Sequence, residues 1–272
     1  MTALLITATF TSMPLLAQDQ NPVHPWLEDD FVMSLGVFVP RKEFKLSVDG
    51  EVPGREIDFR QLTGASETQS TASVNARWKF GDDWSVAGQY WSTDESGKAV
   101  LSEDVYWGDN VLRAGSNVKA GVDVDVARVF FGREFFTDEK QHEFGVGGGL
   151  HWLRIGAFIE GEMFVNDESR GVRRESVSAE MPLPNIGAWY WRSLSPRWLL
   201  TTHVDWFSAS IDEYKGSLWN LGAGFQYQIS DHIGLGLSYQ YFRIDVEVDK
   251  SSWDGDVQLT QDGAFLSLNI NW

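Results

Sequence analysis

The last ten residues, Gly263-Ala-Phe-Leu-Ser-Leu-Asn-Ile-Asn-Trp272, decide the fold of this chain. Apolar side chains alternate there with ones that are small or polar apart from Phe265, and the chain stops on an aromatic residue. Successive side chains of a β-strand point to opposite faces, so the alternation predicts a strand with one apolar face. That face comprises Ala264, Leu266, Leu268, Ile270 and Trp272.

The same alternation recurs from Phe31 onward and predicts about ten strands. We expect them at 31–49, 69–80, 84–101, 118–136, 141–163, 175–192, 197–212, 217–229, 232–249 and 255–272. Short turns alternate with mostly longer polar links, which is typical of a barrel with both ends on the periplasmic side. We therefore expect an all-β fold, a transmembrane antiparallel up-and-down β-barrel that closes on itself and leaves no backbone unpaired in lipid.

Composition excludes several classes of protein. The chain has no cysteine, which excludes a disulfide framework, a thiolate metal site and a cysteine nucleophile. A net charge of −17 argues against nucleic acid as a partner, because phosphate binding needs a basic surface. Apolar runs of transmembrane-helix length do not occur beyond the N-terminus, which argues against a helical membrane protein. We expect no cofactor and no metal.

The N-terminal part divides into two segments. Residues 1–17 are apolar and end at a small residue, which is typical of a secretory signal peptide, although no Lys or Arg precedes Arg41. Residues 18–30 turn polar and contain proline, and we expect a short periplasmic lead-in there. The β-barrel then comprises residues 31–272.

Aromatic spacing indicates where the strands cross the membrane. Four strands carry large side chains eight residues apart on one face: Phe144 and Trp152, Trp198 and Trp206, Trp219 and Tyr227, Ile233 and Tyr241. Each pair brackets a nine-residue span. A tilted strand needs about 9–11 residues to cross the hydrocarbon layer. The pairs therefore predict a periplasmic and an outer aromatic girdle.

Beyond the outer girdle the polarity of the two faces reverses. In the strand expected at 232–249, Arg243 and Asp245 continue the lipid-facing side, while Phe242 and Ile244 face inward. Five other strands behave alike, so we expect the barrel to protrude above the membrane, polar outside and apolar inside. The candidate residues for a hydrophobic pocket there are Phe44, Val124, Ile155, Phe207, Phe242, Ile244 and Val246. They either line a cavity or form a closed core, and packing across a narrow barrel favours the core.

At membrane depth the inward face is polar. Arg128, His151, His203 and Asp205 are expected to meet inside the barrel at similar depth. They could form a proton-linked switch or a catalytic His-Asp pair. We favour a charge-compensated network that fills the lumen, because buried charges require partners.

Two further features leave alternatives open. Asp123, Asp125, Glu160 and Glu162 could bind calcium, but a solvated acidic rim bridged to lipopolysaccharide by divalent ions is favoured. The prolines at 182 and 184 indicate an irregularity near the outer rim. They leave the directions of Trp189 and Trp191 undecided.

Three stretches carry a resemblance to a known class: residues 182–191 (PLPNIGAWYW), 216–227 (GSLWNLGAGFQY) and 234–242 (GLGLSYQYF). They look like the corresponding strands of uncharacterised proteobacterial outer-membrane β-barrel proteins. The terminal strand also resembles the signal that the barrel-assembly machinery reads, which usually ends in Phe rather than in Trp272. The resemblance implies a location in the Gram-negative outer membrane, with lipid and lipopolysaccharide as partners. It implies no activity.

Three functions are weighed on this basis. We expect a structural or surface-interaction barrel with a closed or nearly closed, porin-like lumen. The alternative is binding or passage of a small hydrophobic compound. A lipid-modifying enzyme comes last, because His151 and His203 point inward by parity and no outward Ser lies close to an outward His. We therefore expect no catalytic residues.

Overall fold

The computed structural model describes residues 23–47, 57–58, 70–107, 109–136, 141–165, 168–211, 214–250 and 253–272. Ten long strands form the barrel: β1 (Phe31–Leu46), β3 (Thr71–Phe80), β4 (Trp84–Val100), β7 (Asn117–Phe136), β8 (His142–Val165), β9 (Glu168–Ser195), β10 (Trp198–Ile211), β11 (Tyr214–Ser230), β12 (Ile233–Lys250) and β13 (Trp253–Asn271). Smaller elements are β2 (Ile57–Asp58), β5 (Val105–Trp107), β6 (Asn110–Leu112) and the 3-10 helix η1 (Pro25–Leu27). Within this part of the chain, no helix is long and apolar enough to cross a membrane.

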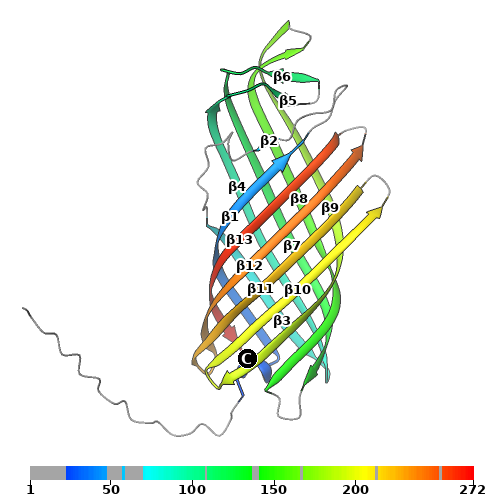
Figure 1. The fold of residues 1–272 in the computed structure, drawn as a ribbon. Helices are drawn as coiled ribbons and strands as arrows, with labels where there is room; N and C mark the ends of the chain where they lie inside the picture. Colours follow the sequence, from blue (N-terminus) through cyan, green and yellow to red (C-terminus); the bar gives the residue numbers. More distant parts are fainter. Residues whose placement is uncertain are drawn as a thin grey trace, which may run out of the picture.

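The long strands form a closed antiparallel ring (Figure 1). Each pairs with its neighbours in the chain, and β1 pairs with β13 from Val32↔Asn271 to Leu46↔Val257. The ring closes at its lower end, where Phe31 N donates to Trp272 O at 2.9 Å and Trp272 N donates to Phe31 O at 3.0 Å. The prediction of an up-and-down barrel of about ten strands is confirmed.

The outer surface carries the predicted apolar belt. Trp152 and Trp206 of the outer girdle are 47% and 41% exposed, and Trp198 of the periplasmic girdle is 46% exposed. In the terminal strand, Leu266 and Leu268 are exposed, while Asn269 and Asn271 are fully buried. The faces follow the predicted parity, apolar toward lipid and polar toward the lumen.

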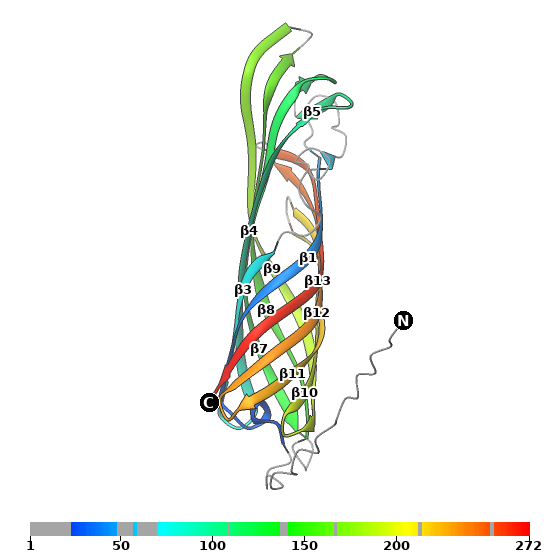
Figure 2. The same ribbon diagram turned by 90° about the vertical axis from the view of Figure 1, so that its left-hand side faces the viewer.

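Above the outer girdle the ring separates into two sheets. In the described ladders, β1 pairs with β3 only from Phe31 to Phe38, and β10 pairs with β9 only up to Trp206↔Ile186. Further up, β1, β13, β12, β11 and β10 form one wall, and β4, β7, β8 and β9 form the other (Figure 2). The protruding part is therefore a two-sheet sandwich. The sequence predicts that the barrel protrudes, but it does not predict the separation into two sheets.

Prolines lie where the two sheets separate. Alternate residues of a strand direct their N–H groups to the same edge. Pro40 lies two residues beyond Phe38 on the edge of β1 that faces β3, and Pro184 lies two residues from Ile186 on the edge of β9 that faces β10. Each proline occupies the position that would supply the next donor of the ladder. The described ladders end there, and proline has no N–H with which to continue them.

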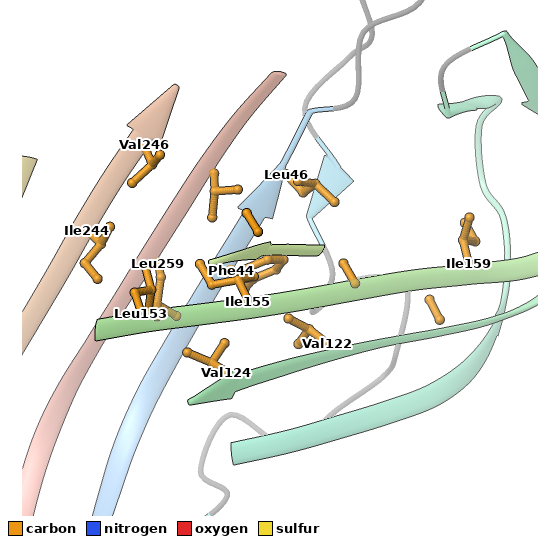
Figure 3. Packing of buried hydrophobic residues seen from close by; sticks show 14 of the residues in the cluster. Phe44, Leu46, Val122, Val124, Leu153, Ile155, Ile159, Ile244, Val246 and Leu259 are labelled. Carbon is orange, nitrogen blue, oxygen red and sulfur yellow. The ribbon is translucent and has the colours of Figure 1, made fainter. Parts of the chain in front are cut away.

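The sandwich is filled by an aliphatic core. Leu153, Ile159 and Ile244 are 0% exposed, and they come from both walls (Figure 3). Leu218 of β11 is likewise 0% exposed. Segment 102–117, expected as a loop, contains the β5–β6 hairpin, which pairs with β8 and adds Trp107 and Leu112 to this core. The aliphatic core therefore occupies the interior above the membrane.

Candidate functional site in the barrel interior

A cavity of about 200 Å³ lies beneath the aliphatic core, at membrane depth. The amide side chains of Asn75, Gln89, Gln226 and Gln240 line it, together with hydroxyls and aromatic rings. These residues have the inward parity predicted from the sequence. The cavity is therefore polar and aromatic, with room for several water molecules or one small molecule.

Arg128 and Asp205 form an ion pair at this depth. Arg128 Nε lies 2.8 Å from Asp205 Oδ2, and Arg128 Nη2 donates to Asp205 Oδ1 at 2.9 Å. Asn220 Nδ2 also donates to Asp205 Oδ2, at 2.9 Å. The carboxylate, which is 1% exposed, therefore accepts hydrogen bonds at both oxygens, as a buried charge requires.

The two histidines have different neighbours. His151 is 0% exposed, and its Nδ1 lies 3.1 Å from Asn185 Oδ1. His203 lines the cavity and contacts Gly222, where an added Cβ would come within 2.2 Å of His203 Cε1. Of the four residues predicted to meet, the structure thus joins Arg128 and Asp205 directly and places both histidines beside that pair.

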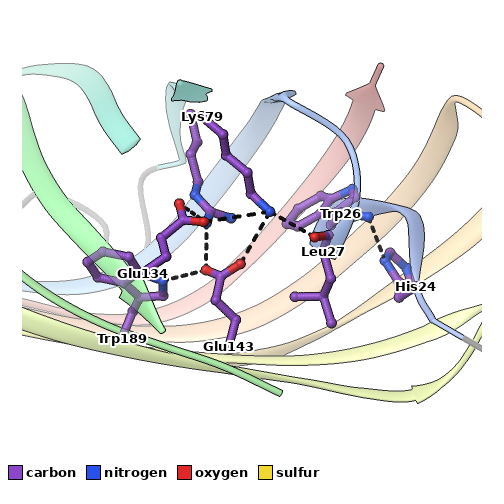
Figure 4. A network of polar contacts seen from close by, with 8 residues as sticks. His24, Trp26, Leu27, Lys79, Glu134, Glu143 and Trp189 are labelled. Atoms are coloured by element: carbon purple, nitrogen blue, oxygen red, sulfur yellow. Dashed lines mark hydrogen bonds and ion pairs between the residues drawn. The ribbon is translucent and has the colours of Figure 1, made fainter. Parts of the chain in front are cut away.

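A second ionic network lies below the cavity (Figure 4). Arg77 donates to Glu134 and, at 2.5 Å, to Glu143 Oε1. Lys79 Nζ lies 3.3 Å from Glu143 Oε2 and 3.8 Å from Glu134 Oε2. Two cations and two carboxylates balance each other. From the sequence, only Arg77 is expected inside. Glu134 and Glu143 could have been placed there as well, because each stands next to a Phe that points outward and neighbouring residues of a strand face opposite ways.

This network also settles the directions of the two tryptophans of β9. Trp189 Nε1 donates to Glu143 Oε1 at 2.6 Å. The guanidinium carbon of Arg77 lies 4.2 Å from the centre of the Trp191 ring, a cation–π contact. Trp189 and Trp191 therefore both point inward.

The N-terminal plug, residues 23–29, lies in the lower mouth of the barrel. Trp26 and Leu27 are 5% and 3% exposed, and Trp26 lines the cavity. His24 N donates to Ser193 Oγ at 2.9 Å, and Lys79 Nζ donates to Leu27 O at 3.0 Å. Burial lowers the pKa of His24 to about 4. The plug is therefore fixed to strands on two sides of the ring.

The residues proposed for a hydrophobic pocket lie in the aliphatic core. Phe44, Val124, Ile155, Phe242, Ile244 and Val246 are buried there, and Phe207 packs against its margin. The large cavity lies below them.

The acidic residues considered for calcium lie on the outward face of the sandwich. Asp123 is exposed, and Glu162 accepts a hydrogen bond from Ser169 Oγ at 2.8 Å. Over the residues that the structure describes, no three His, Cys, Asp or Glu residues come together as a metal site.

A closed ring with an outward apolar belt and a polar interior defines the class of outer-membrane β-barrels, and the chain is located in the outer membrane. The sequence matches no protein-family model and no curated protein. The fold is similar to that of the outer-membrane protease OmpT from Escherichia coli, with a TM-score of 0.59, 8% identity, and coverage of 90% of this chain and 97% of that one.

Two other solved structures are more distant. The transport unit of the autotransporter AIDA-I from Escherichia coli has a TM-score of 0.40 and 9% identity, with coverage of 96% of this chain and 93% of that one. Ail, the attachment invasion locus protein of Yersinia pestis, has a TM-score of 0.31 and 14% identity, with coverage of 90% and 99%. These likenesses concern the fold alone.

Proposed function

We propose that this protein is a non-conducting outer-membrane barrel whose extracellular sandwich acts as a structural or surface-interaction element. The observation that carries the proposal is that buried side chains occupy the interior at two levels. The aliphatic core fills the sandwich above the cavity, and the plug fills the mouth below it. A solute crossing the barrel would have to displace both.

The wall of β4, β7, β8 and β9 supports a role at the cell surface. β8 and β9 form one ladder up to Val165↔Glu168, and their end rises above the other strands (Figure 2). Side chains near this end are exposed, and Val172 reaches 75%. The guanidinium carbon of Arg174 lies 3.7 Å from the centre of the Phe158 ring, which fixes an exposed cation on the ladder. The wall is thus a preformed surface for a partner outside the cell.

The proposed partners at the barrel surface follow from the belt and the terminal strand. The apolar belt suits outer-membrane lipid, and the polar surface directly above it suits lipopolysaccharide. The terminal strand, with Ala264, Leu266, Leu268, Ile270 and Trp272 on its outward face, suits recognition by the barrel-assembly machinery.

Planar-bilayer conductance tests the closed interior. We expect little or no ion current from the pure protein, and little more after deletion of the plug, because the aliphatic core remains. Large, stable, open-channel currents from the intact protein would refute the proposal.

Surface labelling tests the orientation. The chain has no cysteine, so Val172→Cys and Asp82→Cys introduce single thiols at opposite ends of the barrel. A membrane-impermeant maleimide should label Val172→Cys on intact cells and leave Asp82→Cys unlabelled until the cells are opened. The reverse pattern would exclude a surface role for the β8–β9 ladder.

A second candidate function is binding of a small molecule, which the cavity favours. Its aromatic and amide lining resembles the usual setting of a ligand site. An apolar fluorescent probe should bind the intact protein and lose binding in Ala87→Leu, which fills part of the cavity. Equal binding by both proteins would exclude the cavity as the site. We propose no catalytic role.

A further inference from the structure

Where β9 and β10 separate, two strand edges face each other without pairing in the described ladders. Above Trp206↔Ile186, residues 176–185 of β9 stay paired with β8, and residues 207–211 of β10 stay paired with β11. Each strand therefore has one edge without a partner in the described ladders. We call these facing edges the β9–β10 seam.

The edge of β9 lacks hydrogen-bond donors where the seam begins. Residues 182 and 184 are the next two positions whose N–H groups would face β10, and both are proline. An unpaired N–H against an apolar environment costs several kcal/mol, whereas proline has none to leave unpaired. The β9 edge therefore adds no unpaired N–H group where the seam begins, and the unpaired groups that remain are the carbonyls and the N–H groups of the β10 edge.

The side chains at the seam are apolar inside and small outside. Met181 and Leu183 of β9 are 3% and 5% exposed, and Phe207 of β10 packs against the same core. They converge behind the seam: a Cβ added at Gly216 would lie 3.5 Å from Leu183 Cδ2 and 3.8 Å from Phe207 Cε1. On the outer face, Ser208 is exposed and offers no bulk to cover the seam.

The other separation, between β1 and β4, is bridged. Lys42 Nζ of β1 donates to Thr93 Oγ1 and Glu95 Oε1 of β4, each at 2.6 Å. The short strand β2 also pairs with the edge of β1 at Leu46↔Ile57. Only the β9–β10 seam thus combines an apolar lining with an uncovered edge among the described residues.

The seam begins at the outer boundary of the hydrocarbon layer. Trp206 of the outer girdle pairs with Ile186, and Trp152 of the same girdle pairs with Pro182. The first neighbours of the seam are therefore the acyl chains and headgroup boundary of the outer leaflet.

We propose that the β9–β10 seam binds one alkyl chain, which enters sideways from the membrane boundary and lies against Met181, Leu183 and Phe207. The chain comes from a free fatty acid or from an outer-leaflet lipid, which present the same chemistry. The flexible Met181 side chain suits a ligand that must be accommodated by repacking. This site is independent of the proposed surface function, because it needs neither the tip of the wall nor the cavity.

A disulfide across the seam tests the proposal. If the ladder continued, Ser208 would lie opposite Pro184, so Ser208→Cys with Pro184→Cys can join the two edges. Ser92→Cys with Asp125→Cys is the matched control, because these residues face each other in the intact β4–β7 ladder. Energy transfer from tryptophan to a parinaroyl chain reports binding, either as cis-parinaric acid or as a phosphatidylcholine in nanodiscs.

We expect saturable transfer in the unmodified protein and in the control. The oxidised seam variant should bind at least about tenfold more weakly, and reduction should restore binding. Saturation with the free acid alone identifies a fatty-acid site, and saturation with the lipid alone identifies a lipid site. Saturation with neither, or full binding by the oxidised seam variant, would overturn the proposal.

Amide hydrogen exchange tests the seam without any ligand. The backbone amides of Ser208 and Ser210 should exchange as unpaired groups in the unmodified protein. Pro182→Ala with Pro184→Ala restores two donors, so the β9–β10 ladder should extend, exchange at Ser208 and Ser210 should slow about tenfold or more, and parinaroyl binding should weaken. Slow exchange at both serines in the unmodified protein would show a closed seam and overturn the proposal.

Discussion

Ile244→Ala tests whether the protruding sandwich is a packed core. Ile244 is 0% exposed, and it pairs with Leu259 on one side and Leu218 on the other. The substitution removes three carbon atoms, worth about 2.4 kcal/mol at roughly 0.8 kcal/mol for each buried methylene. Hydrogen-bonded neighbours on both sides prevent collapse, so a cavity term raises the expected loss to about 3–4 kcal/mol.

Guanidinium unfolding of the barrel in detergent micelles measures this loss. Ile233→Ala is the matched control, because it makes the same deletion in β12 where Ile233 is 45% exposed in the lipid belt. Detergent can fill the space at Ile233, so the control should lose clearly less stability. Equal losses in the two variants, or unchanged stability of Ile244→Ala together with lost binding of an apolar probe, would refute the closed core.

Three further predictions concern the lower half of the barrel. Glu143→Gln leaves Arg77 and Lys79 short of a buried carboxylate and should destabilise the barrel by about 3–5 kcal/mol in the same unfolding assay. Glu247→Gln, at the exposed pair with Lys215, should change stability by less than about 1 kcal/mol, and equal effects would contradict the buried network. The pKa of His24 falls from 6.5 to about 4 on burial, so the plug binds in its place with full free energy above about pH 6.5. As the pH falls toward 4, this free energy decreases, by about 2 kcal/mol near pH 5. Limited proteolysis of the plug should rise accordingly, and a pH-independent rate would exclude the mechanism. A chain that ends at Gln261 lacks half of β13 and should fail to insert, as judged by fractionation and heat-modifiable migration, whereas normal insertion would contradict the closed ring.

The strands and their faces could be predicted because alternation is a local property. The direction of each side chain follows from its parity within the strand, so Ile244 inward and Trp206 outward follow from the sequence alone. The pair of Arg128 and Asp205 was accessible in the same way, since both residues lie on inward faces at similar depth.

How far each strand pairs with its neighbours was harder to predict from the sequence. Parity shows which face a residue occupies but not where a ladder ends, so the separation into two sheets emerges only from the structure. Pro184 is the residue in the sequence that indicates where the β9–β10 ladder ends. Because β9 pairs continuously with β8 on one edge, the missing N–H of Pro184 can be assigned to the other edge, which faces β10. The plug left no comparable pattern: Trp26 and Leu27 belong to a segment too short for periodicity, and their burial depends on strands far away in the chain.

The contacts of the plug also fix an order of events during assembly. Leu27 is held by Lys79 of β3 and His24 by Ser193 of β9, so the binding place of the plug spans strands that are far apart in the chain. These strands take their final positions only when the ring closes between β13 and β1. The first described residues of the chain therefore reach their place after the last ones, and until then the cavity remains in contact with the periplasm.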